Sequence, residues 1–145
     1  MEERPDVLIC LKKLHKSIMN RCYCKSNGNY KYYGGRGIAV CKKWHSFPAF
    51  YKDMKESWFK GAELDRIHSS RGYSKSNCRW VTHKENMRNR RCSLYCEVEP
   101  GVFMSLGDVV DTFGINVNKA KRKYKTIRKE ILFNEGKRYF EITYR

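Results

Sequence analysis

One aspartate and three asparagines lie within residues 63–91, a strongly basic stretch of the sequence. Asp65 falls in a short segment that predicts a β-strand, and Asn86 falls in a later segment that predicts a helix. Carboxylate and amide oxygens are the ligands that Mg²⁺ prefers in proteins. A magnesium ion bound among so many basic side chains would suit a reaction at a DNA phosphate.

Two strands and a helix are expected to position these side chains. The segment around Asp65 predicts the first strand, a polar loop follows, and residues 77–82 predict the second strand. Thr82 and Glu85 form a T-x-x-E capping box, which predicts that the helix begins at Thr82. Spacings of three and four residues place polar side chains on one side of this helix, namely Asn86, Asn89 and Arg90.

Two more helices are expected earlier in the chain. Residues 6–22 carry apolar side chains at helical spacing, and Ser46 followed by Pro48 marks the start of the other helix. Between them, three glycines within residues 34–37 indicate a tight backbone path or close approach to a ligand. Residues 38–41 predict a short strand.

The charge balance changes near Cys92 and divides the chain into two parts. Residues 1–92 carry 21 basic and 8 acidic side chains, whereas residues 93–145 carry 10 and 7. We therefore expect an α+β domain over residues 1–92 and a second, small module over residues 93–145.

The second part predicts a winged helix-turn-helix. Two strands about a Pro100-Gly101 turn precede a helix that Ser105 caps and Gly114 ends. A basic helix then begins at Asn116. Its expected inward side chains are Val117, Ala120, Tyr124 and Ile127, and its expected outward ones are Lys119, Lys121, Arg122, Lys123 and Lys125. The last element is a hairpin over residues 131–133 and 137–142.

A formal net charge of +16 points to nucleic acid, because each neutralised phosphate releases counterions. A membrane surface would call for one long amphipathic basic helix, but here the charge is spread along the chain and mixed with 14% aromatic residues. No apolar run is long enough to cross a bilayer, and the acidic N-terminus lacks a signal-peptide core. We expect duplex DNA as partner, no membrane, no small-molecule substrate, and a cytosolic location.

Four segments resemble, in order, motifs of the phage-type HNH homing endonucleases. They read YYGGRGI, VCKKW, LDRI and SNCRW, at residues 32–38, 40–44, 64–67 and 76–80. The resemblance covers most of residues 7–91, and the second part resembles the additional DNA-binding modules of such nucleases. It implies a ββα-metal fold and a sequence-selective endonuclease that cuts or nicks duplex DNA with Mg²⁺ or Mn²⁺.

The resemblance also implies roles for single residues. Asp65 matches the metal-binding carboxylate, Asn86 completes the ligand set with Asn89 as second choice, and Asn77 braces the loop between the strands. Phosphate and groove contacts are expected from Arg36, Arg79, Lys84, Arg88, Arg90, Arg91, Lys119, Lys121, Arg122 and Lys123. Asn118 is a candidate base reader, since a carboxamide matches adenine.

One departure from the family concerns catalysis. Arg66 stands where the best-known members carry the histidine that activates water, and arginine stays protonated, so it cannot act as an ordinary base. Arg66 would instead grip the phosphate, and His68 is the candidate base, ahead of His83. Two alternatives stay open: an inactive HNH-derived DNA-binding regulator or inhibitor, and an RNA-binding protein whose aromatic residues stack on bases.

Purely structural roles for these residues also stay open. Asp65 could simply pair with a nearby arginine. The cysteines include a set that could converge on zinc, namely Cys22, Cys24, Cys41 and Cys78. No C-x-x-C pair is present, so we expect buried thiols rather than a structural Zn²⁺ site.

Overall fold

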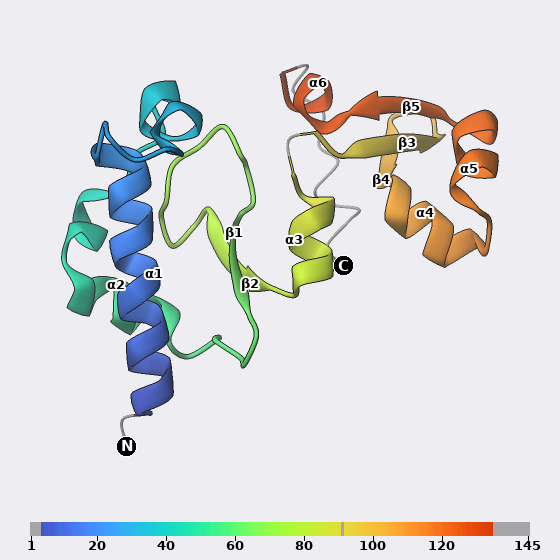
Figure 1. The fold of residues 1–145 in the computed structure, drawn as a ribbon. Helices are drawn as coiled ribbons and strands as arrows, with labels where there is room; N and C mark the ends of the chain where they lie inside the picture. The colour runs from blue at the N-terminus through green and yellow to red at the C-terminus, as the bar shows by residue number, and fades with distance from the viewer. Residues whose placement is uncertain (1–3, 91, 135–145) are drawn as a thin grey trace. The chain divides into compact units, whose positions relative to one another are not determined.

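The structure is a computed structural model that describes residues 4–90 and 92–134 of the 145 (Figure 1). It is a mixed α+β protein, as expected. The chain forms two compact units, Met1–Thr82 and His83–Arg145, and each is described by itself. The division falls ten residues before the change in charge balance, so the helix that carries Asn86 is grouped with the second unit.

Helix α1 (Pro5–Tyr23) supplies one wall of the first unit's core. Pro5 occupies its first turn, where the missing N–H costs nothing, and its buried side chains recur at helical spacing: Val7, Leu11, Ile18 and Cys22. They pack with Trp44 and Phe50, whose rings meet edge to face at 5.0 Å between centroids. The predicted helix over residues 6–22 is confirmed.

Three short 3₁₀ turns follow: η1 (Tyr30–Tyr32), η2 (Gly34–Arg36) and η3 (Lys42–His45). The glycine cluster allows close approach of the chain to itself. A Cβ on Gly34 would lie 2.0 Å from the backbone oxygen of Cys22 at the end of α1. The strand expected over residues 38–41 is reduced to one parallel bridge, between Val40 and Tyr73.

Helix α2 (Phe47–Met54) begins after Ser46 as predicted and buries Phe50 and Met54. An antiparallel hairpin then forms from β1 (Glu63–Arg66) and β2 (Cys78–Val81), which confirms both predicted strands. Its register places Asp65 directly opposite Arg79.

The second unit begins with α3 (His83–Arg88), immediately after the predicted cap residue Thr82. Its sheet has the order β4-β3-β5, all antiparallel, from β3 (Leu94–Glu99), β4 (Val102–Ser105) and β5 (Lys125–Arg128). Strands β3 and β4 join through the predicted Pro100-Gly101 turn. Successive residues of β3 face opposite sides, so Tyr95 packs with Phe103 and Leu132, and Cys96 with Val109 and Ala120.

Two short helices follow the hairpin of β3 and β4. Helix α4 (Leu106–Phe113) is capped by Ser105, whose hydroxyl accepts from the N–H of Asp108, and it ends at Gly114 with φ of 59°. Helix α5 (Val117–Lys123) is capped by Asn116, whose side-chain oxygen accepts from the N–H of Lys119. These caps are confirmed, and the two helices pack against each other (Figure 1).

The predicted first strand of the C-terminal hairpin, the wing of the expected winged helix-turn-helix, is wrong. Residues 131–133, predicted as a strand, lie in α6 (Lys129–Asn134), and residues 137–142 lie outside the described part of the chain. Helix α5 ends at Lys123, so Ile127 sits on β5 opposite Tyr95 and not on a helix. The reason is the open edge of β3: a nearby segment with β-branched residues satisfies that edge by pairing with it.

Candidate functional site

Asp65 lies at the centre of the β1–β2 hairpin. Its side chain is buried, with the residue 6% exposed, and its Oδ2 accepts from Nε of Arg79 at 3.1 Å. Strand register explains the ion pair, because cross-strand neighbours on one face lie within side-chain reach. Arg79, predicted to contact DNA, therefore holds the candidate catalytic carboxylate.

Arg66 secures the loop that leaves β1. Its Nη1 donates to the backbone oxygens of Ser69 and Arg71, both at 2.8 Å. Its guanidinium also lies 5.2 Å from the ring centre of Tyr33 and 5.1 Å from that of Tyr73. Ser69, Arg71 and Tyr73 lie in the loop that follows β1, whereas Tyr33 comes from a distant segment, and no motif in the sequence indicated this anchoring role.

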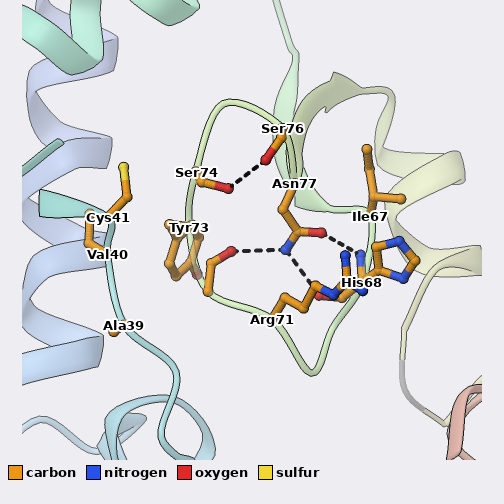
Figure 2. Close-up of a pocket in the computed structure, with 11 residues that line it drawn as sticks. Ala39, Val40, Cys41, Ile67, His68, Arg71, Tyr73, Ser74, Ser76 and Asn77 are labelled. Atoms are coloured by element: carbon orange, nitrogen blue, oxygen red, sulfur yellow. Dashed lines mark hydrogen bonds between the residues drawn. The ribbon is translucent and has the colours of Figure 1, made fainter. Parts of the chain in front are cut away.

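Asn77 fastens the same loop from its other end (Figure 2). Its Oδ1 accepts from the N–H of His68 at 2.9 Å, and its Nδ2 donates to the carbonyls of His68 and Gly72 at 3.1 and 2.9 Å. The residue is only 5% exposed. Strand β1 ends at Arg66, so His68 lies in the loop that follows it.

Replacing Asn77 by alanine should destabilise the first unit by about 3 kcal/mol, because one N–H and two carbonyls lose their partner in a buried place. Thermal or urea unfolding of the variant measures this. Ser76→Ala is the matched control in the same loop. Ser76 is exposed, and among the described residues its hydroxyl meets only that of Ser74, at 3.2 Å, so its effect should stay below about 0.5 kcal/mol. Equal effects of the two substitutions would contradict the bracing role.

A pocket of about 380 Å³ opens beside this loop (Figure 2). Ala39, Val40 and Ile67 contribute apolar lining, and the polar lining includes His68, Arg71, Ser74 and Ser76. Imidazole, guanidinium and hydroxyl groups together suit a small polar or anionic group. The sequence predicted only His68 and Asn77 here, since Arg71 and Ser74 lie outside the quoted motifs and Ser76, the first residue of SNCRW, was given no role.

The donor chemistry fits magnesium better than zinc. Mg²⁺ needs only one or two carboxylates when water completes its shell, and Asp65 supplies one in the first unit. Zinc needs deprotonated thiols, yet burial raises the pKa of Cys78 to about 12 and also raises that of Cys22, while Cys24 is exposed. Among the residues that the structure describes, no three His, Cys, Asp or Glu side chains form a group that could bind a metal ion.

Two basic side chains of α3 that were predicted to contact DNA form ion pairs within the second unit. Lys84 donates to Asp111 at 2.8 Å, and Arg88 pairs with Asp108 and, at 2.6 Å, with Asp111. Gly107 makes room for Arg88, since a Cβ there would lie 2.5 Å from its Nε. Lys84 and Arg88 therefore fasten α3 to α4.

The carboxamides near α3 differ from expectation, because the helix ends at Arg88 and Asn89 and Arg90 follow it. Asn89 was expected on the exposed side, but it is 4% exposed, and its side-chain and backbone oxygens accept from Nζ of the buried Lys129. An ammonium group on that oxygen disqualifies it as a metal ligand. Asn86 is partly exposed on α3, so its pairing with Asp65 stays a prediction from the sequence, while Arg90 is exposed and Arg91 lies outside the described residues.

The ion pairs on α3 should make the stability of the second unit depend on pH in the acid range. Hydrogen bonds from Lys84 and Arg88 lower the pKa of Asp111 from 3.8 to about 2. A lowered pKa in the folded state means stability that is complete above pH 3.8 and lost as the pH falls towards 2. Asp111→Asn should therefore melt below the wild type at pH 7, and the difference should vanish near pH 2. A difference that is constant with pH would contradict this assignment.

Helix α5 and strand β5 carry several exposed basic side chains. Every residue predicted there for DNA contact is exposed: Asn118, Lys119, Lys121, Arg122 and Lys123. Lys125 and Arg128 of β5 are exposed as well, and neither element contains an acidic residue. In the first unit, Arg36 is exposed on η2 and its Nη1 donates to the backbone oxygen of Tyr32 at 3.4 Å.

Comparisons with protein-family models, with curated proteins and with solved structures found no match. Within residues 4–90 and 92–134, none of the helices is long and apolar enough to cross a bilayer.

Proposed function

We propose that the protein binds duplex DNA through α5 and cuts or nicks it as a divalent-metal-dependent, HNH-type endonuclease. The observation that carries the binding half is the exposed surface of α5, which we propose to be the second helix of a helix-turn-helix. It presents four basic side chains and one asparagine without a competing carboxylate on the helix. Cationic side chains there would neutralise phosphates and release counterions.

The catalytic half depends on Asp65. A carboxylate on β1, beside a loop that Asn77 and Arg66 hold in place, supports the proposal because a metal ligand needs a rigid support. Asp65 would hold Mg²⁺ or Mn²⁺, with Asn86 as the second ligand implied by the resemblance. Such an ion would stabilise the charge that develops on the phosphate during hydrolysis. His68, in the pocket beside the same loop, is the proposed base.

An inactive DNA-binding regulator is the second candidate, and two observations favour it. The carboxylate of Asp65 already pairs with Arg79, and Nη1 of Arg66 donates to two backbone carbonyls. Both side chains are thus engaged in contacts within the protein, and DNA binding by α5 requires neither of them.

Incubation of supercoiled plasmid with Mg²⁺ or Mn²⁺ tests the two candidates. Metal-dependent conversion to open-circular or linear DNA supports the nuclease. Tight, salt-sensitive binding without conversion, on a library that contains host and phage sites, supports the regulator. Preference for single-stranded RNA over duplex DNA in a competition assay would contradict both.

A further inference from the structure

Val117 occupies an unexpected position on α5. It was expected to face inward, yet it is 44% exposed, whereas Ala120 is fully buried and provides the inward contact of this helix. Val117 is the first residue of α5, and the residues around it on the helix surface are polar or basic. A β-branched apolar side chain is thus presented to solvent amid positive charge.

Four exposed residues lie on one side of α5. Val117, Asn118, Lys121 and Arg122 stand at positions i, i+1, i+4 and i+5, which on a helix of 3.6 residues per turn form one contiguous surface. Lys119 and Lys123 lie beyond Arg122, and the buried Ala120 borders the other edge. A partner that meets it must carry negative charge beside a small apolar group.

Duplex DNA has that chemistry in its major groove. The phosphates supply negative charge on both sides, and the C5-methyl of thymine is the apolar group that projects among the base edges. We propose that Val117 is a specificity-determining residue that contacts a thymine methyl, beside the base that Asn118 reads. This inference rests on the proposed binding of duplex DNA through α5, but not on cleavage.

RNA is the less suitable occupant of this surface. Uracil lacks the methyl group, and the major groove of an A-form helix is too deep and narrow for side chains to read. An isolated exposed valine needs no explanation in general. Here it lies at the edge of the exposed face of α5 that would enter the groove, next to Lys121 and on the same face as Asn118 and Arg122.

The test begins with selection of bound sequences from a random duplex library by the full-length protein, without divalent metal so that no strand is cut. Each thymine of the selected site is then replaced singly by deoxyuridine, which removes one methyl and keeps the base pair. For the wild type, one such replacement should weaken binding about fourfold, because burying one methyl contributes ~0.8 kcal/mol and a factor of ten corresponds to ~1.4 kcal/mol.

Variants identify the residue that senses the methyl. Val117→Ala should bind the thymine and deoxyuridine versions of that position equally, which makes the four measurements a double-mutant cycle. Ile131→Ala is the matched control, since Ile131 is 47% exposed in the same unit but lies on α6, and it should keep the wild-type sensitivity. Unchanged melting temperatures show that the fold is retained.

The outcomes separate this inference from the proposed function. If a site is selected but no deoxyuridine replacement weakens binding, or if Val117→Ala keeps the sensitivity of the wild type, the thymine contact is overturned and DNA binding stands. If no duplex is enriched, or if RNA competes better than DNA, both proposals are overturned.

Discussion

Replacing Lys121 and Arg122 together by alanine is expected to weaken duplex-DNA binding roughly 30-fold at 0.15 M salt. Both side chains are exposed on α5 and neither forms an ion pair among the described residues, so their charge is available to phosphates. Each phosphate contact releases about 0.9 counterion, and losing two should therefore flatten the plot of log K against log salt by about 1.8. Fluorescence anisotropy over a salt series gives both numbers.

A charge-preserving double variant provides the control. Lys121→Arg with Arg122→Lys keeps both positive charges, so the salt slope should stay as in the wild type even if selectivity changes, because arginine and lysine contact bases differently. Both variants should melt like the wild type, since exposed positions contribute little to stability. An unchanged affinity and slope in the double alanine variant would remove α5 from the DNA interface.

Asp65→Asn is expected to abolish metal-dependent plasmid nicking, with a loss on the order of 100-fold or more. The substitution keeps the shape of the side chain but removes the charge that would hold the cation. It also breaks the ion pair with Arg79, which lies in a mostly buried place, and should cost on the order of 3 kcal/mol of stability. Loss of nicking alone would thus not separate catalysis from folding.

Arg79→Gln makes that separation possible. It breaks the same ion pair and leaves the carboxylate in place, so its stability should fall by a similar amount while metal-dependent nicking persists. Mn²⁺ should raise the melting temperature of the wild type and of Arg79→Gln, and not that of Asp65→Asn, because a ligand stabilises only a fold that binds it. Nicking by Asp65→Asn at the wild-type rate would rule out Asp65 as the catalytic metal ligand.

Local signals in the sequence predicted much of the fold correctly. The apolar spacing of α1 and the caps of α4 and α5 act within one or two helical turns, so neighbouring residues determine them. The hairpin of β1 and β2 follows from two short strand signals around a polar loop. The charge of +16 likewise depends on composition alone and indicates the class of partner without any structure.

Contacts between distant segments decided the rest. Residues 125–128 became β5 because β3 offered an unpaired edge, and no periodicity in so short a segment distinguishes that outcome from a continued helix. Asn89 became buried because Lys129, forty residues later, donates to it. Arg66 became an anchor of its own loop partly through the ring of the distant Tyr33, and Val117 was left at the surface because Ala120 is the buried residue of α5. The sequence thus determined which side chains could do chemistry, while tertiary packing determined which of them remain available for it, because burial and pairing depend on partners that are far away along the chain.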